Sequence, residues 1–269
     1  FKGSWLSIWL AHLGAKVVGV SHSEVSKPSN FAVSAISTVI EDHRLDIRDT
    51  DAIKALVEKV QPDFVFHLAA QALVRPSYEN PIETMTINAI GTANVLDALR
   101  VLNKKVVAVM ITSDKAYDNV EWVWGYRESD RLGGKDPYSA SKGMAELVIR
   151  SYVESFFNDP DSNIRVGITR AGNVIGGGDW AIDRIVPDCM EAWAGGETVD
   201  IRSPHATRPW QHVLEPLSGY LVLAADLAQS DKNHGEAYNF GPSADQNYPV
   251  SNLIDEMSKY WDQIRWNDI

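Results

Sequence analysis

Short apolar runs alternate with amphipathic stretches along residues 1–172. The runs are rich in β-branched and aromatic residues and predict strands, whereas apolar positions three or four apart predict helices. Strands are expected at Lys16–Val20, from Val39-Ile40 onward, and at Phe64–Leu68, Val106–Thr112 and Ile164–Thr169. Helices are expected at Ser4–Leu13, Asp51–Val60, Glu83–Leu102 and Ser139–Phe156, with loops at Ser21–Ser37 and around Arg75, Pro76 and Pro81. This alternation favours βαβ units and an α/β fold with a doubly wound parallel sheet.

The alternation stops after Gly172. Glycine- and proline-rich loops follow at residues 176–178, 195–196 and 204–209, and one longer apolar stretch predicts a helix at Val213–Gln229. We therefore expect an α/β domain at residues 1–172 and a smaller lobe, interleaved with it, at residues 173–269. The chain begins without Met inside a helical pattern and ends in another predicted helix near Trp261, so both ends are expected to be incomplete.

Charge and cysteine content narrow the possible functions. The 269 residues carry a formal net charge of -11, which argues against nucleic-acid or anionic-membrane partners because both require a basic surface. Cys189 is the single cysteine, so it is expected in the core, and neither an intramolecular disulfide nor a cysteine metal site is predicted. No apolar run approaches the roughly 18 residues of a membrane span, and no secretory signal is visible, so the cytoplasm is the expected location.

Tyr138 and Lys142 stand four residues apart at the start of the helix predicted at Ser139–Phe156, so their side chains share one face. A cation beside a phenol lowers the pKa of the phenol and makes it usable as a base near neutral pH. The spacing alone favours two solvated helix residues over a catalytic pair. The apolar positions of this helix, among them Met144, Leu147 and Tyr152, face either the sheet or another subunit.

Other chemically useful residues follow predicted strands. Ligands of open parallel sheets bind at the carboxyl ends of the strands. Leu68-Ala69-Ala70 would let a bulky ligand approach the backbone there, or serve tight packing. Ser113-Asp114-Lys115 follow the next strand, where Asp114 can be a turn cap or a catalytic group. Asn88, a poor helix former, either holds a backbone carbonyl or a water in the site, or faces solvent.

These residues together resemble the extended short-chain dehydrogenase/reductase superfamily, in its NAD-dependent epimerase/dehydratase branch. Several longer runs are similar to the CDP-glucose 4,6-dehydratases of that branch. The runs are Phe1–Leu6, His67–Gln71, Thr112–Lys115, Glu121–Glu128, Arg170–Trp180 and Ala206–Pro216. The resemblance covers nearly the whole chain. It implies a Rossmann-like fold with a smaller substrate-binding lobe, bound NAD, and a lyase that makes deoxysugar precursors of lipopolysaccharide O-antigen.

The resemblance also implies roles for the catalytic residues. Tyr138 would take the proton of the sugar 4-hydroxyl while NAD accepts hydride from carbon 4. Lys142 would lower the pKa of Tyr138 and hold the nicotinamide ribose, and Ser113 would bond the same sugar oxygen. Asp114 and Lys115 would serve the loss of water across carbons 5 and 6, giving CDP-4-keto-6-deoxyglucose. Lys115 would act either as the base or as a cation that stabilises the enolate.

Binding residues follow from the same resemblance. The residues expected to bind NAD, besides Tyr138 and Lys142, are Gly3, Asp46, Ile47, Leu68, Ala69, Ala70 and Asn88. Arginines suit a diphosphate because the guanidinium is planar. The residues expected to bind the nucleotide sugar are Arg75, Asn173, Arg184 and Arg208. Trp122, Trp124, Trp180 and Trp210 would line the same cleft or lie in the core.

The sequence departs from the family pattern at two places. Only Phe1, Lys2 and Gly3 of the glycine-rich nucleotide loop are present, so the first strand is expected to be missing. We expect either a longer natural protein or a fragment whose NAD affinity is impaired. Ser21 and His22 stand where a carboxylate selects NAD over NADP, so that choice rests on the family alone. The alternatives are another nucleotide-sugar epimerase or dehydratase, and a non-catalytic NAD-binding protein. In relatives the helices at 83–102 and 139–156 pair across a dimer, so a homodimer is expected.

Overall fold

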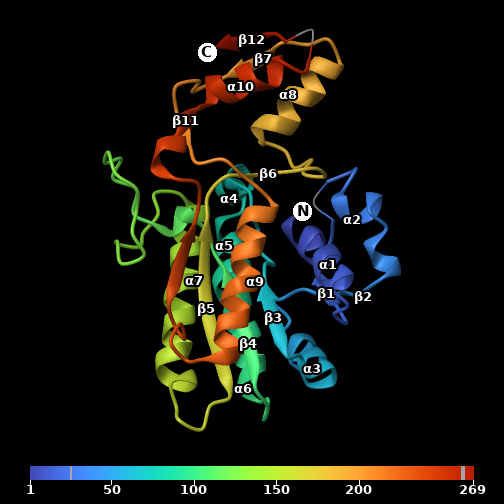
Figure 1. Ribbon diagram of the computed structural model, residues 1–269, viewed down its shortest axis with the longest axis vertical. Helices are drawn as coiled ribbons and strands as arrows, with labels where there is room; N and C mark the ends of the chain where they lie inside the picture. The colour runs from blue at the N-terminus through green and yellow to red at the C-terminus, as the bar shows by residue number, and fades with distance from the viewer. Residues whose placement is uncertain (25, 262–263) are drawn as a thin grey trace.

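The computed structural model describes residues 1–24, 26–261 and 264–269. Its centre is a four-stranded parallel sheet with the strand order β10-β5-β4-β3. The strands are β3 (Phe64–His67), β4 (Val106–Ile111), β5 (Ile164–Ala171) and β10 (Ala237–Phe240). Helices cover both faces of this sheet (Figure 1), which confirms the predicted α/β fold with a parallel sheet.

Strand β4 organises the core because all six of its residues are buried. Val106, Ala108 and Met110 point to one face, where α6 (Gly91–Arg100) and α7 (Pro137–Tyr152) pack. The residues between them, such as Val109, point to the other face, where α1 (Lys2–His12) and α9 (Leu214–Gln229) pack. A strand buried on both faces reads as a continuous apolar run, which is why its position could be predicted.

A second, two-stranded parallel sheet lies apart from the first and consists of β1 (Val18–Ser21) and β2 (Glu41–Arg44). The connecting stretch predicted as a loop contains α2 (Asn30–Val33) and a 3-10 turn at Ile36–Thr38. Helix α3 (Thr50–Val60) follows, with the Asp49 carboxylate accepting from the backbone N of Ala52. The absence of a first strand before α1, expected from the sequence, stays a prediction.

Two features of the helices differ from expectation. Arg75 and Pro76 lie in a short helix, α4 (Val74–Glu79), rather than in a loop. The single helix expected at Glu83–Leu102 is α5 (Pro81–Met85), a π-helical turn at Thr86–Ile90, and α6. The side chain of Asn88 bonds to groups outside the helix, and a local π-turn of this kind is common at functional sites.

Helix α7 exposes part of its apolar stripe. Met144 and Leu147 are exposed, and 57% of Leu147 is accessible to solvent. Lys142 and Glu146 are buried against the sheet. Of the apolar positions that predicted this helix, Tyr152 packs against the core beside the sheet, whereas Met144 and Leu147 do not.

A small lobe lies at one end of the sheet (Figure 1). It comprises α8 (Ile185–Ala194), β7 (Val199–Ile201), α10 (Val250–Ser258) and β12 (Trp266–Asp268) around a core that includes Cys189 and Trp193. Short pairs lie between lobe and sheet: β6 (Val174–Ile175) with β9 (Gln211–His212), and β8 (Thr207–Arg208) with β11 (Tyr248–Pro249).

The predicted end of the chain in a helix near Trp261 is wrong. The last described residues form β12, which pairs in parallel with β7. Residues 262 and 263 of the expected helix lie outside the described residues. Three residues are too few for a periodic signal, and only the pairing with a distant strand makes them a strand. Among the described residues, no helix has both the length and the apolar character needed to cross a membrane.

Candidate functional site

The first group of site residues stands at the carboxyl end of β4. Ser113 is buried, and its hydroxyl donates to Asp114 Oδ1 (2.9 Å) and accepts from the backbone N of Lys115 (3.2 Å). These bonds start a 3-10 turn at Asp114–Ala116 that turns Asp114 inward and leaves Lys115 exposed. Burial raises the pKa of Asp114 above its ordinary value, and the hydrogen bond from Ser113 and the charge of Lys115 act against it with smaller effect.

The second group stands at the amino end of α7. Asp136 caps the helix by accepting from the backbone N of Ser139 (2.9 Å), and Pro137 occupies the first turn. This start places Tyr138 and Lys142 on the buried face, 8% and 6% exposed. The predicted shared face is therefore real, and the two residues are not solvated.

The pKa of Tyr138 is raised in this structure and not lowered as expected. Burial is the main cause, while a hydrogen bond with Ser113 and the charge of Arg184 lower the pKa with smaller effect. Burial also lowers the pKa of Lys142 to about 8, assisted by the charge of Lys2 and opposed by that of Glu146. Desolvation disfavours the charged form of both side chains.

Asn88 connects α7 to the segment that follows β3. Its side-chain amide donates to the carbonyl of Gln71 (3.0 Å) and to Ser141 Oγ (2.8 Å), and its oxygen accepts from the backbone N of Gln71 (2.9 Å). Of the alternatives open from sequence, holding a backbone carbonyl is the one observed. The half-buried segment Leu68-Ala69-Ala70 at the end of β3 is thereby held beside α7.

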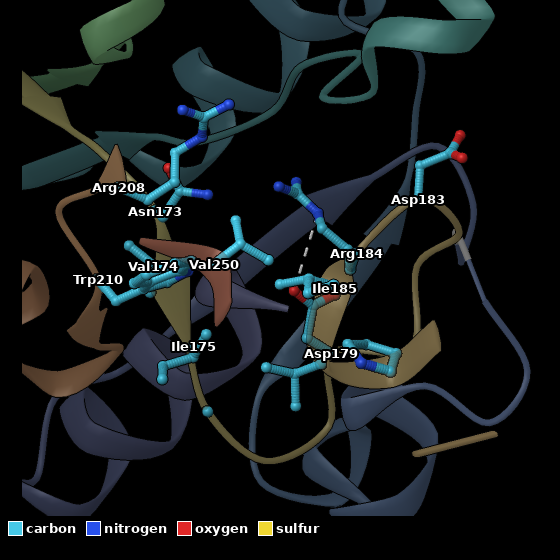
Figure 2. A pocket seen from close by; sticks show the side chains of 13 residues that line it. Asn173, Val174, Ile175, Asp179, Asp183, Arg184, Ile185, Arg208, Trp210 and Val250 are labelled. Atoms are coloured by element: carbon cyan, nitrogen blue, oxygen red, sulfur yellow. Dashed lines mark ion pairs between the residues drawn. The ribbon is translucent and has the colours of Figure 1, made fainter. Parts of the chain in front are cut away.

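A cavity of about 250 Å³ opens between the sheet and the lobe. Figure 2 shows Asn173, Arg208 and Trp210 along one side of it and Arg184 on the other. Arg184 Nε and Trp210 Nε1 are buried and have no hydrogen-bond partner among the described residues, and Asp179 Oδ2 is 4.0 Å from Arg184 Nε. Buried donors are almost always satisfied, so these two indicate a ligand with anionic or hydroxyl oxygens.

The structure brings three of the four predicted substrate-binding residues together at this cavity: Asn173, Arg184 and Arg208. Arg75 lies elsewhere. Its guanidinium pairs with Asp183 Oδ1 at 2.8 Å, and Asp183 lines the cavity (Figure 2) whereas Arg75 does not. Arg75 therefore fixes the segment before Arg184 rather than reaching the cavity.

The remaining residues expected to bind NAD lie at the β1–β2 side of the molecule. Gly3 is in the first turn of α1, and a Cβ there would meet nothing within 4 Å. Asp46 is engaged by Arg48 through two nitrogens (2.9 and 2.6 Å), which lowers the pKa of Asp46. Ile47 packs in the core, where a Cβ on Gly91 would come within 2.5 Å of its Cδ1. Only the backbone of Ile47 is thus left for a ligand.

The tryptophans divide between cavity and surface. Trp210 lines the cavity, whereas Trp122, Trp124 and Trp180 are exposed and belong to no core cluster among the described residues. Trp122 stacks against Trp124 and Tyr126 in the loop before α7.

Sequence reasoning missed three buried groups near the site. Lys2 lies among Asp114, Asp179 and Arg184, and burial lowers its pKa to about 8. Glu146 and Arg170 form a buried ion pair behind the strand ends. The spacing of Glu146 four residues after Lys142, on the same face, was the signal that could have revealed it.

Comparisons with known proteins agree with this arrangement. The family model described as GDP-mannose 4,6 dehydratase matches residues 1–257. CDP-glucose 4,6-dehydratase of Salmonella typhimurium is 46% identical to 99% of this chain, which spans 75% of that relative. GDP-mannose 4,6-dehydratase of Yersinia enterocolitica is 29% identical over 57% of this chain and 43% of its own length.

Solved structures of the same fold include two epimerases. UDP-glucuronic acid 4-epimerase from Bacillus cereus, in complex with UDP-glucuronic acid and NAD, superposes with a TM-score of 0.84 at 22% identity. It covers 100% of this chain, which covers 83% of the epimerase. UDP-glucose 4-epimerase from Thermotoga maritima, with UDP-glucose, gives a TM-score of 0.79 at 20% identity, with 100% and 82% covered.

Proposed function

Because this chain belongs to the nucleotide-sugar 4,6-dehydratase family, we propose that it converts CDP-glucose to CDP-4-keto-6-deoxyglucose. The observation that carries the proposal is the position of Asp114. A half-buried carboxylic acid with a raised pKa stands at the same sheet edge as the Tyr138–Lys142 pair. An epimerase needs only the oxidation that Tyr138 and Lys142 serve, whereas loss of water also needs an acid for the leaving hydroxyl.

The residues present fit NAD. The open space beside Gly3 lies at the amino end of the eleven-residue helix α1, where the helix dipole favours a pyrophosphate. Small residues at Ala69-Ala70 leave room for the cofactor at the end of β3, and Tyr138 with Lys142 would hold the nicotinamide ribose. Asp46 and the backbone of Ile47 would lie toward the adenine, and Asn88 holds the Gln71 loop in place. When bound, NAD supplies the hydride acceptor and donor of the reaction.

Tyr138 takes the proton of the sugar 4-hydroxyl in this proposal. Burial raises the pKa of the phenol, whereas Ser113 and Arg184 favour its phenolate, the form in which Tyr138 can accept this proton. Ser113 bonds the same sugar oxygen because its hydroxyl stands at the end of β4 beside Tyr138. The site is therefore arranged to hold one proton between the sugar oxygen and Tyr138.

Asp114 gives a proton to the hydroxyl that leaves carbon 6. Its raised pKa favours the neutral acid, as this step requires. Lys115 is exposed at the rim of the site, and its charge acts on Asp114. We assign Lys115 to stabilising the enolate that forms when carbon 5 loses its proton to water at this exposed rim.

The cavity between sheet and lobe would receive the nucleotide diphosphate. Arg184 and Arg208 present guanidinium groups to it, and Asn173 and the indole N–H of Trp210 add neutral donors. Arg75 acts only through Asp183, which precedes Arg184. We further propose that residues 1–172 bind the cofactor and residues 173–269 mainly the substrate.

The protein is also proposed to be a homodimer. Exposed apolar residues gather on α7, its continuation and the π-turn before α6, with Leu147 57% and Ile90 51% exposed. Phe156 lies beside them under the Arg100 guanidinium, 3.9 Å from its ring centroid. Isolated exposed residues are ordinary, but a contiguous apolar stripe on neighbouring helices favours an interface.

Incubation with CDP-glucose and NAD, followed by detection of the 4-keto sugar, tests the proposal. CDP-glucose should be converted, while UDP-glucose, dTDP-glucose and GDP-mannose should not. Turnover of one of these others in place of CDP-glucose would move the protein to another specificity. Recovery of a 4-epimer without loss of water would make it an epimerase, and cofactor binding without any turnover would leave it a non-catalytic NAD-binding protein.

A further inference from the structure

Glu146 and Arg170 form a completely buried ion pair behind the proposed site. Arg170 Nε donates to Glu146 Oε1 and Arg170 Nη2 to Glu146 Oε2, both at 2.7 Å, so the pair is bidentate. The side chains are 1% and 2% exposed. Neither residue lines the cavity between sheet and lobe. The pair is therefore too deep to touch substrate.

Both partners reach the segment that carries the proposed acid. Glu146 Oε1 accepts from the hydroxyl of Thr112 (2.5 Å), the residue directly before Ser113. Arg170 Nη1 donates to the hydroxyl of Tyr117 (2.6 Å), which ends the 3-10 turn at Asp114–Ala116, and the guanidinium lies 4.8 Å from the centroid of the Tyr117 ring. The ion pair therefore bonds to this segment on both sides of the turn, through Thr112 and through Tyr117.

The same pair is anchored in the helix that carries Tyr138 and Lys142. Glu146 stands one turn beyond Lys142 and two turns beyond Tyr138, on the buried face of α7. Arg170 is in β5, the strand next to β4. The pair consequently connects the Tyr138 helix, the neighbouring strand and both ends of the Asp114 turn.

Buried ion pairs contribute little net stability compared with an apolar pair of similar volume, because desolvation offsets the attraction. Their directional bonds, however, specify one geometry. A 3-10 turn has poor hydrogen-bond geometry of its own, so the position of the Asp114 carboxylate depends on what holds the ends of the turn. Tyr138 and Lys142 are positioned separately, by the Asp136 cap and the first turns of α7.

We propose that Glu146 and Arg170 are positioning residues that hold Asp114 in register with Tyr138, so that they govern loss of water more than oxidation at carbon 4. The catalytic consequence of this inference rests on the proposed function. The hold of the ion pair on residues 112–117 (the clamp) is a property of the chain alone. A displacement of the acid by about 1 Å is enough to cost on the order of 100-fold in the step it serves.

The test uses the double variant Glu146→Leu/Arg170→Met, which removes both charges and leaves neither one buried alone. Two single variants, Tyr117→Phe and Thr112→Val, each release one end of the turn. The matched control is Arg165→Met, which breaks a pair with Asp231 at the opposite end of β5. Thr112→Ser, which keeps the hydroxyl, should restore the behaviour that Thr112→Val loses.

Two readouts separate the clamp from the proposed function. Amide hydrogen exchange of ligand-free protein should become faster at residues 113–117 in the double and single variants and stay unchanged in the control. With CDP-glucose, loss of water should fall about 100-fold in the double variant, while sugar oxidation changes little, so that reduced nicotinamide accumulates and is seen by its absorbance.

Unchanged exchange at residues 113–117 in both single variants would overturn the inference, as would an equal fall of oxidation and water loss. The single variants keep the ion pair, so they remain informative if the double variant does not fold. A wild-type protein that leaves CDP-glucose untouched would remove the proposed function, and the exchange comparison would still decide on the clamp.

Discussion

The carboxylate of Asp114 lies against Gly172, with Asp114 Oδ2 only 3.3 Å from the point that a Cβ on Gly172 would occupy. The same Cβ would be 2.9 Å from Pro209 Cγ. Gly172 follows β5 and Asp114 follows β4, so the missing side chain is what lets two neighbouring strand ends approach. The site needs glycine here for space rather than for backbone freedom, since its φ is not in the left-handed region.

Gly172→Ala should therefore displace the proposed acid. Loss of water is expected to fall at least about tenfold, because small displacements of a catalytic group are costly. Steady-state conversion of CDP-glucose measures the effect. Gly195→Ala is the control, since its Cβ would meet the nearest atom, Ala192 O, at 3.4 Å in the lobe. A Gly172→Ala enzyme with wild-type turnover would contradict the placement of Asp114.

Trp210→Phe should weaken substrate binding while leaving the chemical step intact. The substitution keeps an aromatic ring but removes the buried Nε1 donor, which has no partner in the part of the chain that the structure describes. A lost hydrogen bond to a ligand oxygen costs about 0.5–1.5 kcal/mol, or up to about 3 kcal/mol if the oxygen is charged. KM should rise correspondingly with kcat unchanged. Trp124→Phe, in the exposed loop, should leave both constants at their wild-type values.

Lys142 should make the stability of the fold depend on alkaline pH. Its pKa is lowered from 10.5 to about 8 by burial, so the folded state disfavours the charged form. Below about pH 8 the ammonium is charged in both states and costs the folded protein about 3 kcal/mol. Between 8 and 10.5 the unfolded state holds more protons, so stability rises with pH.

Lys142→Met should reduce this rise, while Lys2, whose pKa is also lowered to about 8, should keep its own contribution. The variant should be more stable than wild type at pH 7, and its advantage should shrink as the pH is raised toward 10.5. Urea unfolding at several pH values measures the difference. Lys232→Met, at an exposed position, provides the comparison. A constant difference between Lys142→Met and wild type across this range would show that the ammonium is not buried.

Asn88→Ala should destabilise the fold. It removes the acceptor for the buried segment at Gln71 and the donor to Ser141, and an unsatisfied buried group costs about 1–3 kcal/mol. Chemical denaturation gives the free energy of unfolding, and Asn103→Ala, at an exposed position, serves as the control. A loss of less than about 0.5 kcal/mol would mean that water replaces the side chain without penalty.

Leu147→Glu should convert the proposed dimer into monomers. A charge in the middle of the exposed apolar stripe of α7 would have to be desolvated in the interface. Sedimentation velocity should give a dimer for the wild type and a monomer for the variant. Val222→Glu, on the exposed side of α9, is the matched control. A wild-type protein that is monomeric at high concentration would remove the proposed interface.

The local pattern of the sequence determined most of the elements and the pairs within them. Strand β4 is a continuous apolar run, and α7 places Tyr138 and Lys142 on one face because four residues are close to one helical turn. Ser113 and Asp114 are at a strand end for the same reason, since the apolar run stops there. These are relationships between neighbours in the chain, and periodicity is sufficient to establish them.

Only the tertiary structure decided which face of α7 is buried, in which direction the Tyr138 pKa shifts and which residues hold Asp114. Leu147 faces outward, whereas its neighbour Glu146 meets Arg170, 24 residues away, on the sheet side. Burial rather than the neighbouring lysine sets the direction of the Tyr138 pKa. The strand β12 exists only through its pairing with β7. Each of these features depends on residues that the fold brings together from distant parts of the chain. Spacing along the sequence does not encode the burial and loss of hydration that result from these contacts.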